Sequence, residues 1–138
     1  MVDEARVLSK ISELDGYLKE LKSVLPKTYP GYKQVEKKRS CERLLQLMIE
    51  CVIDVCKLFV SGLKLGIPSQ ETDLFEKMLA EGIISRKVRD ILQEMRAFRN
   101  ILVHEYAVVD DEIVFDRLKN HLRDFEKIKK AITGALKK

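Results

Sequence analysis

One segment in the second half of the chain gathers side chains that could do chemistry. Between positions 96 and 106 it carries two arginines, an asparagine, a histidine and a tyrosine, namely Arg96, Arg99, Asn100, His104 and Tyr106. On a helix, Arg96, Arg99 and Tyr106 share one face, and Asn100 and His104 lie one turn apart on the adjoining face. Arg99 and His104 differ by about 140° of rotation. A long arginine side chain can still reach a ligand that it shares with the imidazole.

These residue types suit the chemistry of a phosphodiester bond. Histidine titrates near neutral pH, so His104 could accept or donate a proton. The guanidinium of Arg99 keeps its charge and offers a planar fork to phosphate oxygens. Such a pair can cut RNA without a metal ion, because a base activates the 2′-hydroxyl and a cation stabilises the charged phosphorane. Arg96 and Asn100 are candidates for RNA or phosphate binding, and the Tyr106 hydroxyl could orient phosphate or be modified.

The same residues also have a purely structural interpretation. An arginine and a histidine near the end of a helix commonly interact with the last carbonyl groups and with the helix dipole. On residue types alone this is the more frequent outcome, so the chemical interpretation needs support from the wider pattern.

The wider pattern resembles a known family. The string Arg99-x-x-x-x-His104-x-Tyr106 is similar to the R-x-x-x-x-H-x-Y signature of the HepT-like toxins within the HEPN family. Phe98 precedes the arginine, an apolar run follows it, and the acidic residues 110–112 open the next expected helix. The length and the order of helices fit this family along nearly the whole chain.

The resemblance implies both an activity and partners. HEPN domains are helical bundles that form a homodimer and place the Arg and His of both subunits in a shared cleft. By position, Arg99 and His104 would be the catalytic residues of a metal-independent endoribonuclease, with tRNA or mRNA as substrate and no cofactor. The protein would be a toxin whose partner is an MntA-like nucleotidyltransferase antitoxin, and that partner would transfer AMP to Tyr106.

Two other functions remain open. The protein could be a non-catalytic helical subunit that helps a minimal nucleotidyltransferase to bind its nucleotide or substrate. It could also be an adaptor bundle whose second helix mediates assembly. Growth arrest that His104→Ala relieves is expected only of the toxin, and the adaptor predicts no effect of Arg99→Ala beyond stability.

The elements that position these residues follow from apolar spacing and from the places of proline and glycine. We expect about five helices, over residues 3–25, 34–65, 73–81 and 86–106 and from 110–112 onward. Asp73 and Ser85 are expected N-caps, and Gly82 is expected to end a helix in the left-handed conformation. No stretch of useful length alternates with period two. The predicted fold is therefore all-α, an antiparallel HEPN-like bundle that forms a single domain over residues 1–138.

The expected helix over residues 34–65 is apolar on almost every side. Such a helix is central, or it buries a face against a second subunit, and this motivates the homodimer. A narrow polar stripe runs along it, formed by Arg43, Gln46, Glu50, Asp54 and Lys57. If the stripe faces the cleft, Glu50 and Asp54 could orient Arg99 or His104. Exposure to solvent is the simpler interpretation of both acids.

Composition limits the remaining choices. Lys and Arg number 26 against 22 Asp and Glu, a net charge of +4 that permits an anionic partner without requiring one. Three cysteines without a Cys-x-x-Cys pair, and no recognisable signal peptide, predict reduced thiols in a cytoplasmic protein. They give no support to zinc, and no metal site is expected. Charged residues interrupt the apolar region 44–65, so no transmembrane span is expected.

Overall fold

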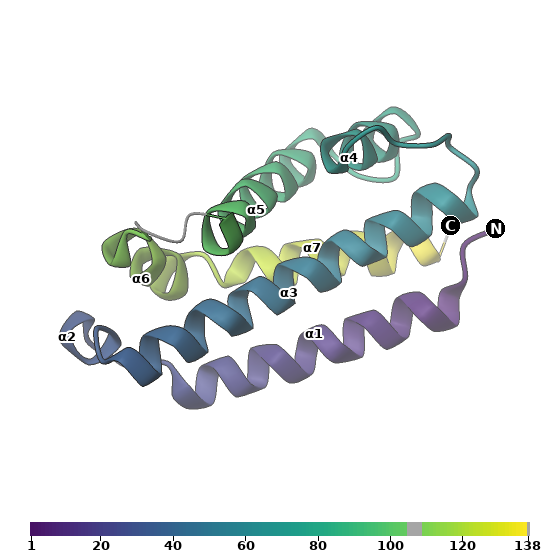
Figure 1. Ribbon diagram of the computed structural model, residues 1–138. Helices are drawn as coiled ribbons and strands as arrows, with labels where there is room; N and C mark the ends of the chain where they lie inside the picture. The colour runs from purple at the N-terminus through teal and green to yellow at the C-terminus, as the bar shows by residue number, and fades with distance from the viewer. Residues whose placement is uncertain (105–108, 138) are drawn as a thin grey trace.

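The computed structural model describes residues 1–104 and 109–137, and in these two ranges the regular elements are all helices (Figure 1). The predicted all-α class is therefore confirmed. The elements are α1 (Glu4–Val24), α2 (Tyr29–Tyr32), α3 (Val35–Gly62), α4 (Glu71–Ala80), α5 (Arg86–His104), α6 (Asp111–Asn120) and α7 (Arg123–Leu136). None of these helices is long and apolar enough to cross a membrane.

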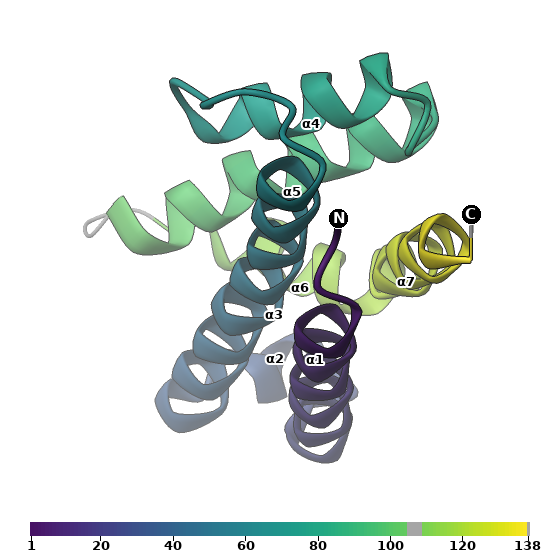
Figure 2. The ribbon, with the colours of Figure 1, turned by 90° about the vertical axis from the view of Figure 1, so that its right-hand side faces the viewer.

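The longest helix, α3, lies at the centre of the bundle. Helix α1 runs antiparallel beside it, and α2, α4 and α5 pack against other parts of its surface (Figures 1 and 2). Twelve of its residues are buried, which confirms that this helix is central. The cover comes from the same chain, so the apolar circumference of α3 is not by itself an argument for a second subunit.

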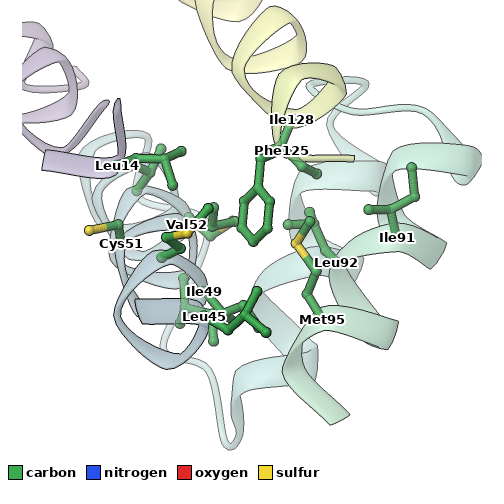
Figure 3. Close-up of a cluster of buried hydrophobic side chains, with 14 of the residues drawn as sticks. Leu14, Leu45, Ile49, Cys51, Val52, Ile91, Leu92, Met95, Phe125 and Ile128 are labelled. Atoms are coloured by element: carbon green, nitrogen blue, oxygen red, sulfur yellow. The ribbon is translucent and has the colours of Figure 1, made fainter. Parts of the chain in front are cut away.

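The core joins four helices that are distant in sequence. Figure 3 shows the Phe125 ring of α7 between α3 and α5, near Val52 and Leu92, and Leu14 of α1 beside α3. Phe125 is 3% exposed, and Val52 and Leu92 are 1% and 2% exposed. Close packing of this kind fixes the rotation of each helix about its axis, and therefore decides which face of α5 is left for polar residues.

One expected helix is divided in two. The chain leaves the helical conformation at His121 (φ −119°, ψ 4°), and α7 begins at Arg123. The apolar stripe of Val114, Leu118, Leu122 and Phe125 keeps its helical spacing through the break, so periodicity could not reveal it. The bend lets α6 pack against α2 while α7 packs against α5.

A second difference is a single helical turn in the segment expected to be a loop. Thr28 caps α2 by accepting a hydrogen bond from the Gly31 amide at 3.2 Å. The turn buries Tyr32 completely, and its ring lies 5.6 Å from the Phe115 ring of α6. Aromatic contact with a distant helix therefore stabilises a turn that Pro30 and Gly31 alone would not predict.

The caps around α4 are partly as expected. Ser85 accepts a hydrogen bond from the Val88 amide at 3.2 Å, and Gly82 has φ +72°, which confirms both assignments. Helix α4, however, begins two residues earlier than predicted. Gln70 is its N-cap, and Asp73 is the third helical residue, whose carboxylate accepts hydrogen bonds from the amides of Ser69 at 2.8 Å and Gln70 at 3.3 Å. This is the second half of a capping box.

Candidate active site

Helix α5 carries the candidate residues because its apolar stripe is docked on the core. Ile91, Leu92, Met95 and Phe98 are buried, and they turn this side of α5 toward the interior. Arg96 and Arg99 then lie at the edge of that buried stripe, next to α3 and α4. Arg96 pairs with a carboxylate of α4, and Arg99 pairs with carboxylates of both α3 and α4.

Arg99 is the most enclosed charged side chain of the candidate site. Its side chain is only 14% exposed. Nη2 donates a short hydrogen bond to Oε1 of Glu71 on α4, and Nη1 lies 3.8 Å from Oε1 of Glu50 on α3. The Nε–H group is buried and meets no acceptor among the described residues. The guanidinium thus lies between two carboxylates, with one N–H group unsatisfied.

Glu71 links both arginines, and the sequence did not single it out. Its Oε1 accepts the hydrogen bond from Arg99 and also lies 3.2 Å from Nε of Arg96. Glu71 is the first residue of α4 and stands 28 positions before Arg99. No periodicity or motif connects positions so far apart. The early start of α4 is the local signal, since acidic residues favour the first turn of a helix.

The two acids of the α3 polar stripe have different surroundings. Glu50 faces Arg99 and accepts a hydrogen bond from Gln46 at 3.1 Å, with its side chain 36% exposed. Asp54, one turn further along, instead pairs with Lys10 of α1 at 3.3 Å. Both acids remain partly exposed to solvent, but Glu50 also faces Arg99, so it is not an ordinary surface acid. Of the two proposed orienting residues, the structure brings only Glu50 to Arg99.

The remaining candidates lie toward the end of α5. His104 is the last residue of the helix and is exposed to solvent, whereas Asn100, one turn earlier, is half-buried. Arg99 and His104 are separated by about 7.5 Å along the helix axis, from a rise of about 1.5 Å per residue. Tyr106 lies outside the described residues.

The charges of the site balance. Arg96 and Arg99 contribute two positive charges, and Glu50 and Glu71 contribute two negative charges within contact distance. An anion that approaches Arg99 therefore competes with a carboxylate rather than entering an uncompensated positive pocket. Among the described residues, no group of three or more His, Cys, Asp or Glu side chains is arranged to hold a metal ion.

An all-helical bundle that presents an arginine and a histidine near the C-terminal end of one long helix has the architecture of the HEPN proteins. The model of the HepT-like ribonuclease family matches residues 14–132. The chain therefore belongs to the HepT-like ribonuclease family, as the Arg99-x-x-x-x-His104-x-Tyr106 string predicted.

Known proteins support this assignment in sequence and in fold. The mRNA nuclease HepT of Shewanella oneidensis is 34% identical over 82 residues, which are 59% of this chain and 62% of that relative. The chain thus aligns with less than two thirds of this relative's length. A tri-AMPylated Shewanella oneidensis HEPN toxin, solved in complex with an MNT antitoxin, is 27% identical with a TM-score of 0.87, over 97% of this chain and 99% of that one. A toxin–antitoxin complex solved with AMP-PNP is 26% identical with a TM-score of 0.85, over 93% and 97%.

Proposed function

We propose that this protein is the toxin of a toxin–antitoxin pair and acts as a metal-independent endoribonuclease. One observation carries the proposal. In a chain of the HepT-like ribonuclease family, α5 presents an exposed imidazole at its end and, five residues earlier, a guanidinium that other side chains hold in place. A proton-transfer group exposed to substrate and a cation held in a fixed position are the two groups that transfer of a phosphoryl group needs.

The reaction follows from the two side chains. Neutral His104 removes the proton from a ribose 2′-hydroxyl, and the 2′-oxygen attacks the adjacent phosphorus. Arg99 binds the phosphoryl oxygens and stabilises the additional charge of the phosphorane. The bond to the 5′-oxygen then breaks, and an imidazolium returns a proton to that leaving oxygen. The products are a 2′,3′-cyclic phosphate and a 5′-hydroxyl, so protons and charges balance.

The assembly is part of the same proposal. Two copies would place both pairs of Arg99 and His104 in one cleft, so that one imidazole can act as the base and the other as the acid. A nucleotidyltransferase antitoxin of the MntA type would silence the toxin by transferring AMP to Tyr106. The support for this step is the similarity to a HEPN toxin that was solved tri-AMPylated and in complex with an MNT antitoxin.

One observation favours a second candidate function. A non-catalytic subunit of a nucleotidyltransferase would use the same residues only to bind phosphate or partner. The pairing of Arg99 with Glu71 and Glu50 favours it, because an arginine that serves only the packing of three helices would be held in the same way.

Cleavage of labelled tRNA and mRNA in EDTA tests the proposal. Purified wild-type protein, shown by intact mass to be free of AMP, is compared with His104→Ala and with His121→Ala. His121 is a matched control, because it lies between Asp116 at 3.6 Å and Asp124 at 3.7 Å, in a different part of the fold. We expect cutting by the wild type and by His121→Ala but not by His104→Ala. Equal cutting by all three would indicate a contaminant, and no cutting by the wild type would favour the second function.

A further inference from the structure

The carboxylate of Glu71 has a relation to Arg99 that no other described side chain has. A single oxygen, Oε1, is the acceptor for Nη2 of Arg99 and also lies 3.2 Å from Nε of Arg96. Both contacts reach from α4 to α5, and all three side chains are at most 26% exposed. Contacts of this kind, shielded from water, hold a guanidinium far more firmly than a pair on the open surface.

The two carboxylates that face Arg99 differ in how firmly they are held. Glu71 sits at the start of α4, where the capping box anchors the backbone and where Leu74 and Phe75 are 2% and 0% exposed. Glu50 approaches the other side of the guanidinium only to 3.8 Å, which is beyond hydrogen-bond distance. Glu71 is therefore the anchor, and Glu50 is the partner that an incoming phosphate can displace.

We propose that Glu71 is a positioning residue that holds Nη2 of Arg99, so that the Nη1 side of the guanidinium is directed toward the scissile phosphate. The inference rests on the proposed ribonuclease function and deepens it. Arg96, held by the same oxygen, is oriented together with Arg99. The geometry thus divides the fork of Arg99 into one edge bound by the protein and one edge for the substrate.

Removal of the Glu71 carboxylate has two opposite consequences. The site gains one net positive charge, so RNA binds more tightly and its binding becomes more sensitive to salt. At the same time Arg99 loses its fixed orientation, and small misplacements of a catalytic group slow the chemical step strongly. A residue that served only stability would not produce this combination of tighter binding and slower cleavage.

The test measures kcat, KM and the salt dependence of RNA binding for wild type, Glu71→Ala and Glu71→Gln. We expect Glu71→Ala to lower kcat about tenfold or more, with KM unchanged or lower and a steeper salt dependence. Glu71→Gln keeps the shape and one acceptor oxygen but loses the charge, so its kcat is expected to lie between that of the wild type and that of Glu71→Ala. If Glu71→Ala fails to fold, the near-isosteric Glu71→Gln decides, and a wild-type kcat and salt dependence for it overturn the inference.

The matched control is Glu76→Ala. Glu76 also bridges α4 to α5, through Arg89 at 2.8 Å, but does not reach Arg99. It should show wild-type kinetics, with a cost in thermal stability no larger than that of Glu71→Ala, because the Glu76 side chain is 49% exposed. If the wild type cleaves RNA and Glu71→Ala has the same kcat, this inference alone is overturned. The same holds if Glu76→Ala loses as much kcat as Glu71→Ala. A wild type that does not cleave overturns the proposed function and this inference with it.

Discussion

At the scale of single residues, the site depends on how one guanidinium is divided among its partners. Arg99 binds Glu71 closely on one side and faces Glu50 loosely on the other. Lysine carries the same charge but has no planar fork, so it cannot serve a carboxylate and a phosphate in two fixed directions.

Arg99→Lys should therefore lower kcat/KM about a hundredfold, which is the usual effect of losing one positioned hydrogen-bond donor to the transition state. Folding should persist, because the ammonium can still pair with Glu71. Single-turnover cleavage of a labelled RNA checks the rate, and Arg89→Lys is the control at an arginine that pairs with Glu76 outside the site. Activity of Arg99→Lys near that of the wild type would contradict the assigned role of Arg99.

Glu50 and Asp54 offer a second comparison, since they lie one turn apart on the same stripe. Glu50 faces Arg99, whereas Asp54 pairs with Lys10. Glu50→Gln should strengthen RNA binding about two- to fivefold, because an exposed ion pair contributes about 0.4–1 kcal/mol and its carboxylate competes with phosphate. Asp54→Asn should leave RNA binding unchanged. Fluorescence anisotropy with a labelled RNA measures both, and equal effects of the two changes would count against the orientation of Glu50.

At the scale of elements, the short helix α4 decides where the anchor lies. Hydrogen bonds from the Ser69 hydroxyl and from the amides of Ser69 and Gln70 lower the pKa of the Asp73 carboxyl below its usual value, so it stays ionised as part of the cap. Gly82 ends the region with φ +72°, which turns the chain back toward α5. The placement of Glu71 next to Arg99 therefore depends on backbone features at both ends of α4.

Two glycines test this backbone requirement. An added Cβ would meet no atom within 4 Å at either Gly82 or Gly16, so space is equal and only the backbone conformation differs. Gly82→Ala should destabilise the protein by about 1 kcal/mol, since alanine disfavours a left-handed conformation. Gly16→Ala, within helix α1, should stabilise it by about 0.5–1 kcal/mol. Urea unfolding measures both, and two changes of the same sign would refute this account.

At the scale of the whole molecule, the core encloses all three thiols. Cys41, Cys51 and Cys56 are free and buried. Burial raises the pKa of Cys41 and of Cys51 from 9.0 to about 11, and that of Cys56 from 9.0 to about 12. The folded protein thus keeps its thiol protons at a pH where the unfolded chain has lost them.

The free energy of unfolding should therefore fall in alkaline solution. Because the folded pKa values lie above the unfolded value of 9.0, this contribution is present below pH 9.0. It is lost progressively as the pH rises to about 11 for Cys41 and Cys51, and to about 12 for Cys56. Urea unfolding between pH 7 and pH 11 should show the loss, which begins near the unfolded thiol pKa of 9.0. A variant with alanine at all three positions should show a shallower slope, and an identical slope would contradict the burial of the thiols.

The sequence alone determined the helical class, most helix boundaries and the Arg99-x-x-x-x-His104-x-Tyr106 string, because these depend on local spacing, capping and residue type. Three features depended on the tertiary structure. The break at His121 is invisible to periodicity, because the apolar stripe continues through it. The different partners of Glu50 and Asp54 depend on which helix packs beside each turn of α3. Glu71 could be found only from the fold, since the contact of α4 with α5 brings it to an arginine 28 positions away.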